Sequence, residues 1–383
     1  MKILALTSIR SEYDLMSSLF SKLHNDPEVE LRLLVGGAHN SPAFGSTYKD
    51  IENDGFKILC RVESLLDADT PSARLKSASI LLMSIIDTVS AYKPDLIIYA
   101  GDREEVLIGG MLGGYLGIPT IHFFGGDHAA DGHIDNPVRH ATSKLSSCHM
   151  VSTIEHLKRL KKIGEPDSRI FNIGSIALDK FIESRNVSDI DKIVSGKKID
   201  RPLALFIYHP IKSEIGREEI ILDAAITALD NAGYHTLIGL ANSDPGNNSI
   251  RNAIKNISKK INNCTIYGNL PRDQFISLFK SSSMIVGNSS AGLLEAASIP
   301  IPCVNIGERQ RGRLAAENVI FVEAQPDKIR AGIQLAASHD FLESTRKVVN
   351  PYGDGKSSQR AYELIKSIDF KSLVLKKEDP LDA

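Results

Sequence analysis

The chain has little cysteine and no excess of charge of either sign. Its four cysteines, Cys60, Cys148, Cys264 and Cys303, are widely separated and form no CxxC pair. This excludes a small disulfide-stabilised scaffold and predicts reduced, mostly buried thiols. The 45 basic residues face 47 acidic ones, for a formal net charge of -2 at pH 7. A nucleic-acid-binding protein generally shows a basic excess, so no nucleic-acid partner is expected.

Long hydrophobic runs are also missing. No stretch approaches the roughly 20 uncharged apolar residues that a membrane-spanning helix requires. Met1-Lys2 leads directly into an apolar strand, without the pattern of a signal peptide. These features predict a cytoplasmic protein without a membrane partner.

What the sequence does contain is an alternation of short aliphatic runs and longer segments with helical periodicity. The 383 residues exceed what one hydrophobic core usually supports, so two domains are expected. In the first half, strands are predicted over 2–6, 30–35, 96–99, 120–123, 150–153 and 170–173. A helix is predicted over 73–92, where Pro94 ends it. This order predicts an α/β domain with a parallel sheet.

A second α/β domain is predicted after a polar linker between Leu178 and Arg201. Its strands are expected over 203–208, 236–239, 265–267, 284–286, 303–306 and 319–322, and its helices over about 217–231, 273–281 and 292–297. The domains are therefore predicted as 1–178 and 179–356, followed by a C-terminal helical segment, 357–383.

Glycine and serine residues follow one strand of the second domain. Gly287-Asn288-Ser289-Ser290-Ala291-Gly292 lies between an apolar strand and an apolar helix. Glycine lets the backbone approach a phosphate, and the helix start and hydroxyl groups supply donors. The turn therefore predicts an anion site, although a serine N-cap on a connecting helix would give the same pattern.

Residues near this turn strengthen the prediction of an anion site. Arg309 and Arg313 follow the next strand, and guanidinium groups suit phosphates. Glu295 could accept the hydroxyls of a ribose. His209 follows the first strand of this domain and could contact a phosphate or a sugar, although a capping role before Pro210 is an alternative.

Acidic and basic residues follow the strands of the first domain. Asp102 and Arg103 come directly after one strand, and the next is followed by a loop that contains Asp127, Asp131 and Asp135 with several histidines. Carboxylates in one cleft can hold different pKa values and so act as proton donor and acceptor. The same loop could hold a metal, although its spacings match no standard zinc or iron pattern. It could also be a polar connection that caps the helix carrying Arg139.

These motifs resemble those of the hydrolysing UDP-N-acetylglucosamine 2-epimerases, which serve sialic and related nonulosonic acid synthesis. The resemblance spans nearly the whole chain. Its most specific elements are Gly101-Asp102-Arg103, the His-x-x-Gly-Gly-acid stretch at His122, Gly287-Asn288-Ser289-Ser290 and Gly307-Glu308-Arg309-Gln310.

The resemblance implies a GT-B-like pair of Rossmann-like domains, with the active site in the interdomain cleft, UDP held mainly by the second domain and the C-terminal helix returning to the first. It implies anti elimination of UDP after loss of the C2 proton, then addition of water with inversion at C2, without metal or other cofactor. Asp102 and Asp135 match catalytic carboxylates. The matches to nucleotide or sugar contacts are Arg10, Arg103, Arg139, His209, Asn242, Phe275, Ser289, Ser290, Glu295, Arg309 and Arg313. By analogy, a homodimer or homotetramer is expected.

The chain departs from the family pattern in one place. Phe124 stands where relatives often carry glutamate, so Asp127 or Asp131 is expected to take that role. The predicted substrate is a UDP-N-acetylhexosamine, either UDP-N-acetylglucosamine or a 2,4-diacetamido relative. The alternatives are a non-hydrolysing 2-epimerase, a GT-B glycosyltransferase and a catalytically inactive nucleotide-sugar sensor.

Overall fold

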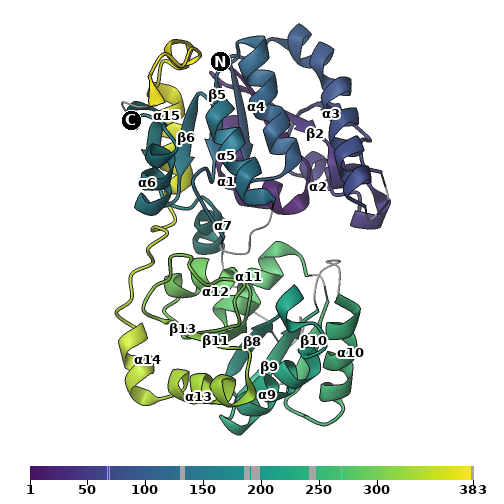
Figure 1. Ribbon diagram of the computed structural model, residues 1–383, viewed down its shortest axis with the longest axis vertical. Coiled ribbons are helices and arrows are strands. Elements are labelled where there is room, and N and C mark those ends of the chain that lie inside the picture. The colour runs from purple at the N-terminus through teal and green to yellow at the C-terminus, as the bar shows by residue number, and fades with distance from the viewer. Residues whose placement is uncertain are drawn as a thin grey trace. The chain divides into compact units, whose positions relative to one another are not determined.

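The computed structural model describes residues 1–66, 68, 70–129, 134–184, 190, 199–240, 247–268 and 270–380. The chain divides into two compact units (Figure 1). The first unit holds Met1–His128, Gly132–Lys180 and Tyr352–Ala383, and the second holds Ala129–Asp131 and Phe181–Pro351. That residues 1–178 and 179–356 form independent domains stays a prediction.

The first unit is built on a parallel sheet of seven strands in the order β3-β2-β1-β4-β5-β6-β7. The strands are β1 (Lys2–Thr7), β2 (Glu30–Val35), β3 (Ile58–Arg61), β4 (Leu96–Ala100), β5 (Thr120–Phe123), β6 (Cys148–Val151) and β7 (Ile170–Asn172). The main helices are α1 (Arg10–Asn25), α2 (Tyr48–Asn53), α3 (Pro71–Tyr92), α4 (Glu104–Leu116), α5 (Asp135–Leu145), α6 (Ile154–Lys162) and α15 (Ser357–Ser367). Helix α7 (Ala177–Glu183) leads into the second unit.

The second unit contains a parallel sheet of six strands in the order β10-β9-β8-β11-β12-β13. Its strands are β8 (Leu203–Ile207), β9 (His235–Gly239), β10 (Cys264–Tyr267), β11 (Ser282–Gly287), β12 (Cys303–Ile306) and β13 (Val319–Val322). Its helices are α9 (Glu218–Asn231), α10 (Asn247–Ser258), α11 (Arg272–Lys280), α12 (Ala291–Leu294), α13 (Pro326–Ala336) and α14 (His339–Thr345).

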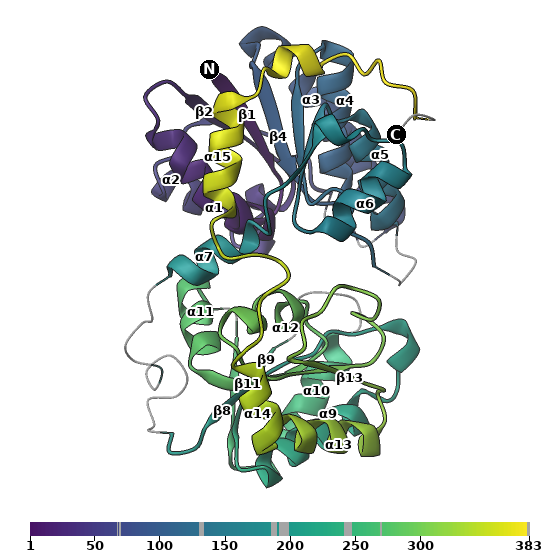
Figure 2. The ribbon, with the colours of Figure 1, turned by 90° about the vertical axis from the view of Figure 1, so that its left-hand side faces the viewer.

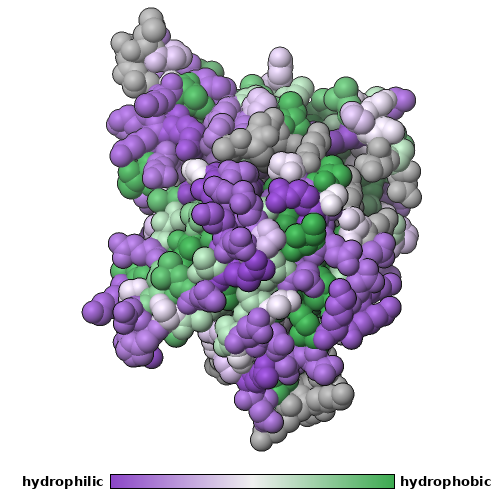
Figure 3. All heavy atoms as spheres, turned by 60° about the horizontal axis from the view of Figure 1, so that its bottom comes forward, coloured by the Kyte–Doolittle hydropathy of each residue, from purple (hydrophilic) through white to green (hydrophobic). Residues whose placement is uncertain are grey.

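Both sheets are covered on both faces, because successive strand residues point to opposite sides. In β1, Ile3 and Ala5 join the core beneath α1 and α15, whereas Leu4 and Leu6 join the core beneath α3 and α4. In the second unit, α9, α10 and α13 cover one face and α11 the other. Seen from the lower end of Figure 1, the surface shows hydrophilic side chains with small hydrophobic groups between them (Figure 3).

The predicted helix over 73–92 forms α3, whose length and composition would by themselves allow a membrane span. Its buried residues, Ala78, Leu81, Ile85 and Val89 among them, pack onto the first sheet. On the other side of the helix, Leu75 and Met83 are 70% and 74% exposed. We therefore assign α3 to the helical layer of the first unit.

Some elements differ from the sequence prediction. Strand β3 was not predicted; it has only four residues, at the sheet edge, and none is fully buried. The helix predicted over 292–297 is the four-residue α12 followed by a 3-10 turn at Ala296–Ser298. Within the C-terminal segment, the α-helix covers Ser357–Ser367 and ends where Ile368 takes an extended backbone conformation.

Helix α15 lies alongside α1 (Figure 2) and is held to α7 by one buried carboxylate. Asp179 is fully buried. Its Oδ1 accepts from the backbone N–H of Ser357 at 3.1 Å, and its Oδ2 accepts from that of Ser358. These are the first N–H groups of α15, which have no partner within the helix. Asp179 therefore serves as the N-terminal cap of a helix that lies far away in the sequence.

Asp179→Ala should lower the free energy of unfolding by about 3 kcal/mol, because two buried N–H groups lose a charged acceptor. Asp179→Asn keeps one acceptor oxygen, so its free energy of unfolding should lie between those of Asp179→Ala and the wild type. Urea denaturation measures the change. The control is Asp369→Ala, at an exposed carboxylate just beyond the same helix. Equal stability of the Asp179→Ala and Asp369→Ala proteins would contradict the capping role.

Candidate functional site

Each sheet has one point where the strand order reverses, and ligands bind beyond the carboxyl ends of strands at such points. In the first sheet this point lies between β1 and β4, which precede Arg10 and Asp102. In the second it lies between β8 and β11, which precede His209 and the turn at Asn288. Most predicted site residues therefore lie at or next to a switch point.

The turn after β11 depends on a glycine. Gly287 has φ +134°, and a Cβ at this position would overlap the carbonyl of Ile207 in β8. The close approach lets the N–H of Asn288 donate to the same Ile207 carbonyl at 3.0 Å. The turn is thereby fixed to the neighbouring strand, where it exposes Ser289 and Ser290 in part.

Asn288 connects three turns of the second unit. Its Oδ1 accepts from the N–H of His209 at 2.7 Å, and its Nδ2 donates to the His209 carbonyl at 2.8 Å. Its own carbonyl accepts from Arg309 Nη1 at 2.9 Å and from Gln310 Nε2 at 3.2 Å. Asn288 is fully buried. It therefore orders the residues after β8, β11 and β12 relative to one another.

The predicted anion-binding residues lie around this centre. Besides His209 and Arg309, these are Ser289, whose Oγ accepts from the N–H of Ala291 at 3.3 Å, and Arg313, whose Nη1 donates to Gln310 Oε1 at 3.2 Å. Ser290 occupies the N-cap position of α12 without a side-chain cap bond. Because α12 has only four residues, it has no long helix dipole that could attract an anion. Any anion must be held by local N–H, hydroxyl and guanidinium groups.

A second group lies beside this turn. Arg272 Nη2 donates to Glu295 Oε1 at 2.5 Å, and the guanidinium lies 5.6 Å from the centre of the Phe275 ring. Glu295 is buried and stands between α12 and the following 3-10 turn. One carboxylate oxygen of Glu295 is thus engaged by Arg272, a residue that was not predicted.

In the first unit, Arg139 holds two of the predicted carboxylates. Its Nη2 donates to Asp102 Oδ2, and its Nη1 lies 3.8 Å from Asp127 Oδ2. His156 Nε2 lies 3.4 Å from Asp127 Oδ1. Arg139 is buried, whereas Asp102 and Asp127 are about a quarter exposed. The carboxylates are therefore accessible, and the cation that orients them is not.

The backbone near these carboxylates is also fixed by side chains. His122 is fully buried, and its burial lowers its pKa to about 3, so the imidazole is neutral. Its Nε2 must donate to the Gly101 carbonyl at 2.8 Å, and Nδ1 then accepts from Ser143 Oγ at 3.0 Å. Phe124 has φ +62°, an uncommon value for a side-chain-bearing residue, and its carbonyl accepts from Arg139 Nη1 at 2.9 Å. Both bonds help to place Asp102.

The remaining predicted residues of the first unit lie in other ion pairs, and Glu104 links those of Asp135 and Arg103 because it pairs with both Arg74 and Arg103. Asp135 Oδ1 lies 3.5 Å from Arg74 Nη2, which also pairs with Glu104 at 2.6 Å. Arg103 Nε pairs with Glu105 at 3.1 Å, and Arg10 Nε lies 3.6 Å from Asp14. Asp131 and Asn242 lie outside the described residues. Within the described part of the chain, no group of three or more His, Cys, Asp or Glu could hold a metal ion.

Described residues line two cavities, one in each unit. One of about 720 Å³ lies in the first unit among aliphatic side chains such as Leu66, Leu107 and Val138, beside Arg103 and Glu104. It offers an apolar surface next to the residues that follow Asp102.

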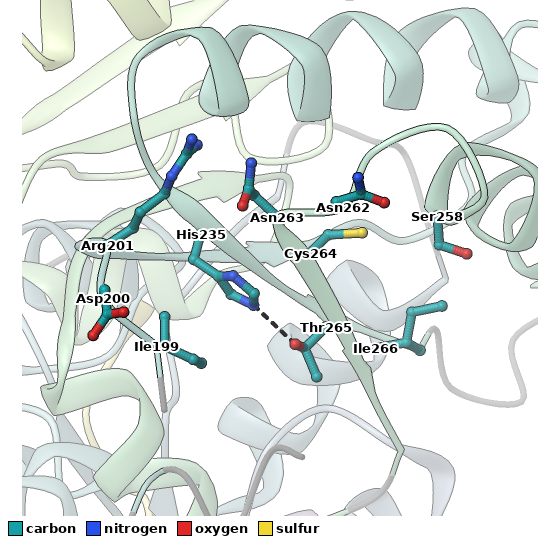
Figure 4. Close-up of a pocket in the computed structure, with 10 residues that line it drawn as sticks. All are labelled: Ile199, Asp200, Arg201, His235, Ser258, Asn262, Asn263, Cys264, Thr265 and Ile266. Atoms are coloured by element: carbon teal, nitrogen blue, oxygen red, sulfur yellow. Dashed lines mark hydrogen bonds between the residues drawn. The ribbon is translucent and has the colours of Figure 1, made fainter. Parts of the chain in front are cut away.

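The other cavity, of about 670 Å³, lies at the amino-terminal ends of β9 and β10 (Figure 4). Three of its polar side chains form hydrogen bonds within the protein. His235 pairs with Thr265 at 2.8 Å, and Arg201 and Asn263 donate to Asp230 at 2.9 and 2.8 Å. We assign no ligand to it.

Sequence reasoning missed several residues that organise the site. Asn288 and His122 stand inside recognised motifs, but a motif does not show which side chains face inward. Arg74 and Arg272 each lie over 20 residues from their acidic partners. An arginine next to an ordinary helix start carries no sequence signal for such a pair.

Comparisons with known proteins identify the family of the chain. The profile of the UDP-N-acetylglucosamine 2-epimerase family matches residues 21–366. The chain is 32% identical over 377 residues to the UDP-N,N'-diacetylbacillosamine 2-epimerase (hydrolyzing) of Legionella pneumophila, covering 98% of each chain. It is 34% identical over 326 residues to the GDP/UDP-N,N'-diacetylbacillosamine 2-epimerase (hydrolyzing) of Campylobacter jejuni, covering 84% of each.

A solved structure shows the same fold. The UDP-GlcNAc 2-epimerase from Neisseria meningitidis, bound to UDP-GlcNAc, superposes with a TM-score of 0.77 at 18% identity, covering 96% of this chain and 100% of that one. The predicted α/β fold, two Rossmann-like units of the GT-B-like type, is therefore confirmed. With a profile that matches most of its length, the chain belongs to the UDP-N-acetylglucosamine 2-epimerase family.

Proposed function

We propose that the protein is a hydrolysing 2-epimerase that converts a UDP-N-acetylhexosamine to UDP and the free sugar with inverted configuration at C2. The observation that carries this proposal is the pairing of Asp102 and Asp127 on one buried arginine, which leaves both carboxylates accessible. Carboxylates placed in this way can accept the C2 proton and deliver protons to reacting oxygens. The two hydrolysing relatives support the same reaction class.

The second unit is proposed to bind the UDP moiety. Ser289 and Ser290 stand on a turn whose backbone is held by hydrogen bonds, with Arg309 and Arg313 nearby. This suits a diphosphate because the donors need little reorganisation. His209 stands on the adjacent strand end, tied to the same turn by Asn288. Glu295 is proposed to contact the ribose through its second carboxylate oxygen, and Phe275 to line the uracil pocket.

The first unit is proposed to carry out the proton transfers. Asp102 is assigned as the base that removes the C2 proton. Asp127 is assigned the role of the glutamate that relatives often carry at the position of Phe124, and His156 Nε2 lies 3.4 Å from its carboxylate. Arg139 positions both carboxylates, and Asp135 is proposed as a further acid–base group. The apolar cavity beside Arg103 has room for an N-acyl substituent of the sugar.

Incubation with a UDP-sugar in the absence of any acceptor tests the function. UDP-N-acetylglucosamine and UDP-N,N'-diacetylbacillosamine are the two substrates to compare, with free UDP and the released sugar followed by NMR. We expect free UDP and a 2-epimeric free sugar from at least one of them. A UDP-linked epimer without free UDP would indicate the non-hydrolysing reaction. UDP release that requires an acceptor would indicate a glycosyltransferase, and no turnover of either would indicate a binding protein.

Asp102→Asn should lower kcat by at least about 100-fold, because a general base typically contributes a factor of 10² to 10⁴. UDP binding should stay within about threefold of the wild-type value, since the proposed UDP contacts lie on other residues. Turnover assays and calorimetry measure the two quantities. Asp87→Asn, at an exposed carboxylate of α3, is the control. Normal turnover by the Asp102→Asn protein would show that another residue is the base.

We also propose that the protein self-associates through α3. Leu75, Met83 and Ile86 are exposed on this helix, and Tyr115 at the end of the neighbouring α4 is 86% exposed. A second copy of the same face would remove these side chains from water.

Met83→Glu should therefore shift the mass measured by light scattering towards that of a single chain. The control is Lys158→Glu, on the exposed side of α6. A wild-type protein that is already monomeric would refute the self-association.

A further inference from the structure

Glu214 is a buried carboxyl that the proposed chemistry does not use. It ends the 3-10 turn Lys212–Glu214 after β8 and is only 3% exposed. Burial raises its pKa to about 7; Glu218 and Glu308 contribute to the increase, and Arg217 opposes it. A buried ionisable group without a full counter-charge is costly to keep, so its position calls for a physical reason.

The first contact of Glu214 is with the end of β8. The hydroxyl of Tyr208 donates to Glu214 Oε2. Tyr208 is buried and stacks on Phe206, with ring centres 6.2 Å apart and planes 5° apart. Because Tyr208 directly precedes His209, the carboxyl is fixed against the strand end that carries one proposed UDP contact.

The second contact is with the end of β12. Gly307 has φ +77°, and a Cβ added there would overlap Glu214 Oε1. The carboxyl thus occupies the space that a side chain at 307 would fill. Arg309, the proposed diphosphate contact, follows two residues later. Glu214 therefore packs against the turns after β8 and β12, which lie on either side of β11 in the sheet.

We propose that Glu214 is a positioning residue for the diphosphate site, which together with Asn288 sets the placement of the His209 and Arg309 turns. This inference rests on the proposed function, because it assumes that the site binds UDP. Asn288 joins the two turns by hydrogen bonds. Glu214 joins them by a hydrogen bond at one end and by close packing at the other.

The charge of Glu214 adds a pH dependence to this role. The charged and titratable groups around it are Tyr208 after β8, Arg217 and Glu218 at the start of α9, and Glu308 after β12. An ionised Glu214 would repel a bound diphosphate, so UDP binding should favour the protonated carboxyl. Since the folded pKa is raised, this favourable state is present at low pH and is lost as the pH rises through about 7.

Glu214→Gln separates charge from shape, because the amide can still accept from Tyr208 and still fills the space at Gly307. Calorimetric UDP titrations should give the same Kd for wild type and variant at about pH 5.5, and a wild-type Kd about fivefold weaker than that of the variant at about pH 8.5. The ionisation of UDP itself affects both proteins equally. Glu219→Gln, at an exposed carboxylate of α9, should follow the wild-type profile.

Glu214→Ala tests the positioning role. Its UDP affinity should be about tenfold weaker than that of Glu214→Gln at both pH values, because the two turns lose their common support. Gly307→Ala should weaken binding in the wild-type background more than in the Glu214→Ala background, where the overlap with Oε1 is removed.

Two results would overturn the inference. If the Kd for UDP changes with pH in the same way for wild type and Glu214→Gln, the charge of Glu214 has no effect on binding. If Glu214→Ala binds UDP with wild-type affinity and only its melting temperature is lower, Glu214 is a purely structural residue. A wild-type protein that binds no UDP at any pH would instead refute the proposed function, and this inference with it.

Discussion

The side-chain amide of Asn288 is the interaction on which the second unit's site depends. The amide accepts from the N–H of His209 and donates to its carbonyl, and the backbone carbonyl of Asn288 accepts from Arg309 and Gln310. An amide can serve both groups of one backbone residue from its two ends, whereas an ionised carboxylate has no donor and an ammonium has no acceptor. The amide can reach them because Gly287 lets the turn approach β8. Backbone conformation and side-chain chemistry therefore determine together where the guanidinium groups lie.

The first unit uses the same principle with a charged residue. Arg139 is buried, yet its guanidinium serves Asp102, Asp127 and the carbonyl of Phe124. A planar group with several fixed donors can hold two carboxylates and a carbonyl in one arrangement, which a lysine could not. His122 adds a neutral donor to the Gly101 carbonyl. Buried side chains thus orient the polar side chains that face the solvent. Such preorganisation is suited to proton transfer.

Most of this fold can be read from the sequence, because buried parallel strands appear as short aliphatic runs with polar residues at their carboxyl ends. Twelve of the strands that form the two sheets were predicted in this way, and the candidate residues follow from them. The edge strand β3 was missed because its residues are partly exposed and so lack the pattern of a buried run. The brevity of α12 was missed because the Ala-rich stretch after it has the composition of a helix.

The partners of the site residues could not be predicted, for a physical reason. Arg139 stands 37 positions from Asp102, and Asn288 stands 79 from His209. Such pairs form only when the sheet brings strand ends together. The role of Glu214 depends on the space above Gly307, which periodicity does not show. Motifs therefore predict a candidate site, whereas the contacts that orient its side chains require coordinates.

The proposed 2-epimerisation requires above all that the C2 proton is removed and then replaced by one from solvent. The reaction in heavy water, with the C2 position of the released sugar followed by NMR, tests it. We expect free UDP together with a sugar that carries one deuterium at C2 and the inverted configuration there. A released sugar that keeps its original C2 hydrogen and configuration would contradict it, since UDP would then leave by simple hydrolysis.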